Sequence, residues 1–423
     1  MQIEDSAKKS TAAKCPVTGM GAEFNPFAAP YLANPYAFWE RARQSEPVFY
    51  SPELDYWVVT RYEDIKAIFA DPTTFSAGNA QTPIEPLAPE VVSMLQSGGL
   101  KTKATMSNAD PPDHTRVRKF TWQAFTPKRI AELEPAIRRI VNRFIDQIEG
   151  VDRADLVQGM FYDLPVHVLF IFLGLPEADI PKVKAWSYKR VMLTWGKLPP
   201  AQQMTEARGL LEYWKYTEAY VESLLAHPPD NYVGDLIRVH QHEASEISVN
   251  EITNVVYGLL VAGHETTTNM SSNAILTLLK YREQWERLCA QPALIPNAVE
   301  ELLRFDSSVI TWRRKTLRAV EMAGVSIPEG ANLLLALCSG NRDDAHFTHA
   351  GQLDLGRENA KTHLSFGFGI HYCLGAPLAR MELKIILEEL SRRKPAMKLS
   401  PGQTWEYSPN TSFRGPGQLW VEW

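Results

Sequence analysis

One of the four cysteines stands in a setting that favours chemistry. The stretch 366–376 reads FGFGIHYCLGA, so that Cys373 is surrounded by Gly367, Gly369 and Gly375. Glycines let a backbone bend tightly and approach another group closely. A helix is predicted directly after this loop, and the dipole and free N–H groups at a helix N-terminus favour a thiolate. A thiolate there indicates a soft metal or a reaction, whereas an isolated cysteine is otherwise most often buried and structural.

The composition excludes several classes of protein. Four cysteines in 423 residues are too few for a disulfide scaffold. The absence of any C-x-x-C motif excludes paired-cysteine zinc sites and thioredoxin-type motifs. With 44 basic and 49 acidic side chains, the net charge of −5 disfavours a nucleic-acid partner. We therefore predict that Cys15, Cys289 and Cys338 are structural.

Periodic apolar patterns indicate a mostly helical chain around this cysteine. A 3.6-residue repeat predicts helices over 35–44, 62–70, 128–148, 160–173, 204–225, 249–280 and 376–393. Strand-like runs are few and short: PVFY with YWVV near the start, VEMAGVSI at 320–327, and QLWVEW at the end. The expected fold class is mainly α with small β-sheets.

The chain shows no boundary between domains, although its length alone suggests two or three. Proline and glycine are spread evenly, and neither a repeat nor a linker is visible. We expect a flexible N-terminal segment, 1–22, followed by a single domain, 23–423. The polar N-terminus lacks the core of a secretory signal, and the most apolar stretch, 164–175, is shorter than the roughly 20 residues that span a bilayer. The sequence thus predicts a cytoplasmic protein without a membrane anchor.

The segment 72–107 has little periodicity and many Pro, Gly, Ser and Thr residues. A loop of this length inside a compact domain is either functional or wrongly assigned. Two interpretations stay open: a lid over a substrate, or a pair of short helices that the pattern does not reveal.

The pattern F-G-x-G-x-H-x-C-x-G, complete at 366–375, resembles the haem-ligand loop of the cytochromes P-450. Four other motifs occur in the order typical of that family: PPDHTRVRK at 111–119, AGHETT at 262–267, E-x-x-R at 301–304 and NRD at 341–343. The resemblance to soluble bacterial members covers essentially the whole chain. It implies the cytochrome P-450 fold, a triangular helical domain that binds haem b.

The resemblance assigns the haem contacts. Cys373 would be the iron ligand, with Gly367 and Gly375 in its loop and backbone N–H groups bonded to the sulfur. His114 and Arg118, four apart on a helix that starts after Pro112, would otherwise be a solvated cationic face. The family places these two positions on a haem propionate, and two further matches complete the cationic set, namely Arg314 and His371.

AGHETT lies inside the predicted helix 249–280. Thr266 can return a hydrogen bond to the carbonyl of Ala262 and open the helix locally, which is common and by itself implies no function. In the family this is the oxygen-binding groove. Ala262 and Gly263 would leave room over the iron, while Glu265 and Thr266 would be the acid–alcohol pair that delivers protons to bound dioxygen.

Glu301 and Arg304 would ordinarily be a surface pair worth well under about 1 kcal/mol. The family buries this pair as a structural network that holds the cysteine loop. Its third arginine aligns here with Gln352, so we expect the network to be neutral at that corner.

The resemblance also places the substrate pocket. Its walls should include part of 72–107 and a set of mostly small or apolar residues, each of which is alternatively plain core: Leu259, His264, Val309, Ile310, Thr311 and Phe413. These residues suit an uncharged aromatic or aliphatic substrate. His264 is either a polar contact or a solvent-facing side chain.

Electrons must come from another protein or domain. The chain has no G-x-G-x-x-G before a helix and no cysteine cluster for an iron–sulfur centre. Its opening resembles haem domains fused to an FMN/iron–sulfur reductase of the phthalate-dioxygenase type. We expect such a reductase, fused C-terminally or separate, or a ferredoxin, with NAD(P)H as the donor. A cationic group is either part of a docking face near the haem or a solvated surface: Arg116, Lys119, Lys128 and Arg129.

The resemblance predicts a haem-thiolate monooxygenase that inserts one oxygen atom of O2 into a C–H bond by hydroxylation or oxidative dealkylation. The first alternative is a peroxygenase driven by hydrogen peroxide, against which Glu265 and Thr266 count. The second is a haem-based sensor without turnover.

Overall fold

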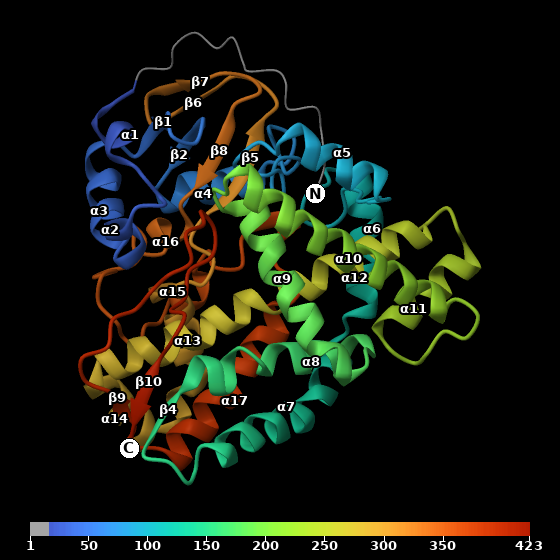
Figure 1. Cartoon of the computed structure of the whole chain (residues 1–423). Coiled ribbons are helices and arrows are strands. Elements are labelled where there is room, and N and C mark those ends of the chain that lie inside the picture. The colour runs from blue at the N-terminus through green and yellow to red at the C-terminus, as the bar shows by residue number, and fades with distance from the viewer. Residues whose placement is uncertain (1–16) are drawn as a thin grey trace.

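The computed structural model describes residues 17–423 and shows a mainly helical molecule with small sheets at its edges (Figure 1). The predicted fold class is confirmed. The α-helices are α1 (Gly19–Glu23), α2 (Ala29–Ala33), α3 (Tyr36–Ser45), α4 (Tyr62–Ala70), α5 (Pro89–Ser97), α6 (Asp113–Ala124), α7 (Pro127–Gln147), α8 (Leu164–Leu173), α9 (Ile180–Trp195), α10 (Pro200–Leu224), α11 (Tyr232–His242), α12 (Val249–Ala262), α13 (Glu265–Lys280), α14 (Arg282–Ala290), α15 (Ile295–Phe305), α16 (Leu337–Gly340) and α17 (Ala376–Arg393).

The strands form three small sheets. The largest has the order β1-β2-β8-β5-β3, in which β2 and β8 are parallel and the other pairs are antiparallel. The second sheet has the order β4-β10-β9, and the third is the pair β6-β7. The strands are β1 (Val48–Ser51), β2 (Tyr56–Val59), β3 (Phe75–Ser76), β4 (Arg153–Asp155), β5 (Trp312–Thr316), β6 (Val320–Met322), β7 (Val325–Ile327), β8 (Asn332–Leu335), β9 (Lys398–Leu399) and β10 (Trp420–Glu422).

The helical core is built around α12 and α13, which cross the interior of the molecule (Figure 1). Most side chains of both helices are buried, because small and apolar residues surround each axis. A capping box starts α12: the Ser248 Oγ accepts from the Glu251 N–H, and the Glu251 carboxylate accepts from the Ser248 N–H. The chain thus fixes where this central helix begins.

The predicted helix 249–280 is interrupted at Gly263 and His264, where α12 ends and α13 begins. At this break the Thr266 hydroxyl donates to the Ala262 carbonyl over 2.6 Å, as the sequence predicts. The break separates two helices that would otherwise be one, and it lies beside the cavity described below.

Most of the other predicted helices are found within a few residues of their expected bounds. The stretch 160–173 differs, because a π-helical turn, η1 (Val157–Phe161), precedes α8. The segment 72–107 is not a pair of helices, since it contains the two-residue strand β3 and the single helix α5. As the sequence predicts, part of it lines the cavity described below, through Gln81, Lys103, Thr105, Met106 and Ser107. Ile84 in this segment donates its N–H to the Thr194 carbonyl over 3.0 Å, which ties it to α9.

The predicted flexible segment 1–22 is only partly described. Residues 17–22 include most of α1, in which Met20 is buried and accepts the Phe24 N–H through its carbonyl. Residues 1–16, with Cys15, lie outside the described residues. Between residues 17 and 423 the structure holds no helix with the length and apolarity that crossing a membrane requires.

Candidate functional site

A cavity of about 290 Å³ lies where α12, α13, α17 and the Cys373 loop meet. Its lining collects residues that are hundreds of positions apart in the sequence. Twelve of the predicted site residues belong to it: Arg118, Leu259, Ala262, Gly263, Thr266, Val309, Arg314, Gly367, His371, Cys373, Gly375 and Phe413.

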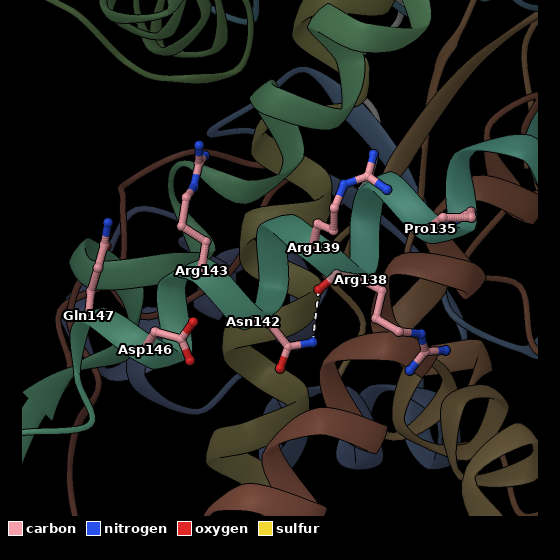
Figure 2. A pocket seen from close by; sticks show the side chains of 7 residues that line it. All are labelled: Pro135, Arg138, Arg139, Asn142, Arg143, Asp146 and Gln147. Atoms are coloured by element: carbon pink, nitrogen blue, oxygen red, sulfur yellow. Dashed lines mark hydrogen bonds between the residues drawn. The ribbon is translucent and has the colours of Figure 1, made fainter.

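A second hollow, about 910 Å³ in volume, runs along α7 and contains none of the predicted residues. Figure 2 shows Arg139 and Arg143 projecting from α7 on one side, and Asn142 donating to the Arg138 carbonyl. Arg138 itself is bound by Glu134, Glu388 and Glu389. The hollow along α7 is therefore larger than the cavity beside Cys373, but it contains none of the residues that the sequence predicts for the functional site.

The loop that carries Cys373 depends on two left-handed glycines. Gly367 and Gly369 both have φ of +70°, and a Cβ added at Gly369 would lie 2.4 Å from the Phe69 carbonyl oxygen. The Cys373 N–H donates to the Phe366 carbonyl over 2.9 Å, which closes the loop. The bend holds the sulfur at the cavity wall, directly before α17.

The surroundings of the Cys373 thiol favour its neutral, protonated form. Burial raises its pKa, although the N–H groups of Gly375 and Ala376 and the charge of Arg118 act to lower it. A helix N-terminus alone therefore does not produce the thiolate that the sequence predicts. A soft metal ion bound to the sulfur would deprotonate it, and the site fits such an ion.

Four cationic or basic side chains form a cluster beside this loop. The rings of His114 and His371 lie 4.2 Å apart, and the Arg118 guanidinium donates to the Tyr372 carbonyl over 2.6 Å. Both ring nitrogens of His114, Nε2 of His371 and Nη2 of Arg314 are buried and find no hydrogen-bond partner among residues 17–423. Unpaired buried polar groups of this kind are costly, and an anion bound by the cluster would satisfy them.

The pKa values of this cluster also indicate a site for an anion. Burial, followed by the charge of Arg118, lowers the pKa of His114 to about 4. Burial and then the charge of Arg314 lower the pKa of His371 to about 3, and burial lowers that of Arg314 to about 10. Carboxylates would satisfy these groups with charge-assisted hydrogen bonds. A ligand with carboxylates near its rim and a soft metal at its centre, which describes a haem, fits the donor set.

The break between α12 and α13 brings one hydroxyl-bearing residue and two small residues to the cavity wall. Thr266, Ala262 and Gly263 all line it. A Cβ added at Gly263 would come within 2.8 to 3.2 Å of the Leu169 side chain on α8. The missing side chain at Gly263 therefore allows α8 to pack closely against the break. It also keeps the cavity wall thin at this position.

Glu265 lies behind this wall rather than in it. Its side chain is buried, its Oε1 atom has no hydrogen-bond partner within the described chain, and it does not line the cavity. Burial raises the pKa of Glu265 to about 7, and the charge of Lys184 partly opposes this shift. A carboxyl group poised near neutral pH can give and take a proton under ordinary conditions.

The Glu265 carboxyl should make stability depend on pH. Because its folded pKa of about 7 exceeds the ordinary value of 4.5, the folded protein retains a proton that the unfolded chain releases between these values. The free energy of unfolding should therefore fall by about 3 kcal/mol as pH rises from 4.5 to 7. Denaturation at several pH values should show a weaker fall in Glu265→Gln. The exposed control Glu222→Gln should keep the full fall, and equal slopes in all three proteins would contradict the assignment.

Three residues predicted to line the pocket lie elsewhere. His264 is fully buried, and its Nε2 donates to the Tyr162 carbonyl over 2.9 Å, so it neither lines the cavity nor faces solvent. Ile310 packs in the N-terminal core, and the Thr311 hydroxyl donates to the Thr411 carbonyl. The prediction that these three residues line the pocket is therefore wrong. Residues next to them in the chain line the cavity instead.

The network around Glu301 also differs from its prediction. Glu301 and Arg304 are fully buried and joined by two contacts of 2.7 Å. A third arginine is present after all: Arg357 Nε lies 3.1 Å from both carboxylate oxygens of Glu301. Gln352 contributes only its carbonyl, which accepts from Arg304 and Arg357. The expectation of a neutral corner is wrong, because the arginine stands five residues later than the alignment placed it.

Two of the four proposed cationic docking residues are engaged inside the fold, whereas Lys119 and Lys128 are exposed. Arg116 pairs with Glu251 at 2.7 Å, and Arg129 pairs with Asp235 at 2.6 Å. Lys128 lies 3.9 Å from Glu132 and is exposed. Two of the four side chains are thus held by carboxylates of other helices and offer less free charge than the sequence suggests.

Sequence reasoning missed several residues of the cavity wall. Arg190 on α9, Asn254 and Tyr257 on α12, and Glu382 on α17 all line it. Burial raises the pKa of Glu382 well above its usual range. No motif marks these positions, because each is a single residue on a long helix, and only the packing of that helix turns it inward.

Comparison with known proteins gives a consistent result. A family model described as Cytochrome P450 matches residues 215–393. The chain is 33% identical to the cytochrome P450 monooxygenase PikC of Streptomyces venezuelae, over 98% of this chain and 96% of that one.

Two solved structures are similar throughout. An intact type IV self-sufficient cytochrome P450 monooxygenase matches with a TM-score of 0.93 and 41% identity, over 97% of this chain and 54% of that one. The cytochrome P450 CREJ, in complex with (4-ethylphenyl) dihydrogen phosphate, matches with a TM-score of 0.91 and 40% identity, over 95% and 99% of the two chains. This chain therefore spans about half the length of the self-sufficient enzyme and nearly all of CREJ.

Proposed function

This chain belongs to the cytochrome P450 family of monooxygenases, and from that premise we propose that it inserts one oxygen atom of O2 into a C–H bond of a small apolar or aromatic molecule. Hydroxylation and oxidative dealkylation are the expected outcomes. The observation that carries the proposal is the single cavity, which holds the Cys373 thiol, the anion-deficient cluster of Arg118, Arg314 and His371, and the Thr266 hydroxyl.

The residues of the chain divide the work. Bound haem supplies the iron that activates O2, and a thiolate ligand favours cleavage of the O–O bond. Cys373 would hold the iron, while His114, Arg118, Arg314 and His371 would hold the two carboxylates. Thr266 lines the cavity, and its hydroxyl would pass on a proton for which the buried carboxyl of Glu265, the preceding residue, would be the source.

The proposed electron source is based on two features of the chain. Its sequence has neither a dinucleotide-binding motif nor a cysteine cluster for an iron–sulfur centre, and it resembles the haem domain of a self-sufficient enzyme. We propose an NAD(P)H-dependent reductase with FMN and [2Fe–2S] centres, fused C-terminally or separate, or a ferredoxin. The proposal is supported by the likeness to an intact self-sufficient enzyme, about half of which this chain spans. Adding such a reductase with NADH to the haem-loaded protein should give turnover.

Substrate binding tests the proposed function directly. The haem-loaded protein should be titrated with small aromatics, alkanes, fatty acids and 4-ethylphenyl phosphate, because a ligand that enters the cavity shifts the spin state of the iron. Turnover under 18O2 should then place one labelled oxygen atom in the product. A protein that binds no member of this panel, and yields no labelled product with any, would refute the proposal. Turnover with hydrogen peroxide alone would favour the peroxygenase.

Replacing Thr266 by alanine should separate electron use from oxygen insertion. Haem binding should persist, because the Thr266 hydroxyl donates to the Ala262 carbonyl and belongs neither to the Cys373 loop nor to the cluster proposed to hold the haem carboxylates. The yield of product per NADH should fall about tenfold or more, and hydrogen peroxide should rise in step, since a positioned proton donor contributes at least about 100-fold to such a step. The control Thr266→Ser keeps the hydroxyl and should stay coupled. Tight coupling in Thr266→Ala would remove this residue from the proton path.

A further inference from the structure

A buried arginine without an acidic partner lines the same cavity. Arg190 on α9 is only 4% exposed and belongs to the cavity wall. Its Nη1 donates to the Tyr257 carbonyl over 3.1 Å, and its Nη2 donates to Gln81 Oε1 over 2.6 Å. The guanidinium also lies 4.3 Å from the centre of the Tyr257 ring. All of these partners are neutral, and within residues 17–423 no carboxylate forms an ion pair with Arg190.

A buried guanidinium in this state lacks a counter-ion. Arginine keeps its proton, and an unpaired buried charge costs several kcal/mol. Two other buried arginines of this chain have carboxylates at ordinary ion-pair distances: Arg304 meets Glu301 at 2.7 Å, and Arg414 meets Asp306 at 2.9 Å. Arg190, Arg313 and Arg314 depart from this pattern, and of these three Arg190 and Arg314 line the cavity, where a ligand can supply the anion.

The remaining buried arginines near the cavity have other assignments. Arg313 donates to the carbonyls of Ala80 and Thr82 and does not line the cavity. Arg314 belongs to the cluster proposed to hold the haem carboxylates. Arg190 therefore has neither a carboxylate of the chain nor a haem carboxylate as its counter-ion.

Further unpaired polar groups belong to residues of the same wall. Trp195 lies five residues after Arg190 on α9, lines the cavity, and has a buried indole N–H with no partner in the described chain. The hydroxyl of Tyr257, another lining residue, is also buried and unpartnered there. The wall that carries the uncompensated charge thus also carries spare hydrogen-bond donors.

We propose that Arg190 binds an anionic oxygen group of the substrate, a carboxylate or a phosphate monoester, remote from the carbon that is oxidised. The proposal rests on the proposed function, and it sharpens the substrate from an uncharged molecule to an apolar one with an anionic end. Arginine recognises both groups through two parallel N–H bonds. The hydrocarbon part would contact apolar lining residues such as Phe172, Leu259 and Val261 on its way to Thr266.

A purely structural role for Arg190 makes a different prediction. Through Gln81 it fastens the segment 72–107 to α9, and Arg313 holds the neighbouring carbonyls of Ala80 and Thr82. If fastening were its whole role, losing the tether would weaken all ligands equally. Only an anion-binding role makes the loss depend on the charge of the ligand.

Matched ligands separate the two roles. The haem-loaded protein should be titrated, by its spin-state shift, with 4-ethylbenzoate, 4-ethylbenzyl phosphate and the neutral 4-ethylbenzamide. We expect the unaltered protein to prefer an anion, with the stronger of the two identifying the headgroup. In Arg190→Gln the Kd of that anion should rise about 10- to 100-fold, since a hydrogen bond to a charged group contributes about 1.5–3 kcal/mol. The Kd of the amide should change less than about threefold, and Arg190→Lys should fall between.

The control Gln81→Ala removes the tether but leaves the charge, and it should keep the preference for the anion. Unchanged absorption of the ferrous–CO complex in each variant verifies that the site has folded. The proposal is overturned if the amide binds the unaltered protein as tightly as both anions, or if Arg190→Gln weakens all three ligands alike. If either result came with labelled product from neutral ligands, the monooxygenase function would stand and the anion site alone would fall.

Discussion

Replacing Cys373 by serine should abolish the red-shifted Soret band of the reduced CO complex and essentially all turnover. The sulfur lines the cavity, and serine offers no soft ligand to the iron. Absorption spectra of the haem-loaded variant, with and without CO, measure the first effect, and product formation measures the second.

A second cysteine provides the control for this experiment. Cys289 is half-buried and does not line the cavity, so Cys289→Ser should leave both the band and turnover unchanged. If Cys373→Ser kept the thiolate spectrum, the assignment of the ligand would be wrong. Loss of haem altogether from Cys373→Ser, with the fold intact, would agree with it.

Replacing Arg357 by alanine should destabilise the folded protein by about 3–5 kcal/mol, because it unpairs part of a fully buried carboxylate. Glu301 would keep Arg304 but lose both contacts from the Arg357 Nε. The carbonyls of Thr348 and His349 would also lose their guanidinium donor. Denaturant unfolding, followed by the release of haem, measures the change.

The neighbouring Gln352 offers a matched control. Its side chain is exposed, and only its backbone carbonyl takes part in the network. Gln352→Ala should therefore change the free energy of unfolding by less than about 0.5 kcal/mol. Equal losses in the two variants would show that the third corner of the network does not lie at Arg357.

The sequence predicted those features of the fold and the site that depend on residues close together in the chain. The helix over 376–393 and the break near Thr266 depend on neighbours within a few positions, and both were found where expected. The cysteine loop was likewise readable, because its glycines are needed for backbone angles set within the loop itself.

The errors at the site involve contacts between distant segments. Arg357 was missed because its distance along the chain from Glu301 is set by an irregular stretch, not by a helical or strand period. His264 was misplaced because a carbonyl at Tyr162, a hundred residues earlier, determines where its ring lies. Arg190 carried no signal at all, since a single arginine on a long helix is ordinarily a surface residue.

The isolated bridge between Val309 and Phe413 has a consequence for how the protein is made. Both residues line the cavity, although they lie 104 positions apart in the chain. The first lining residue is Phe69, so the wall of the binding chamber is assembled from parts of the chain separated by up to more than 300 positions. Such distant pairings must overcome a large loop-closure entropy and form slowly. During synthesis, therefore, the wall of the chamber cannot be completed before the ribosome has released Phe413.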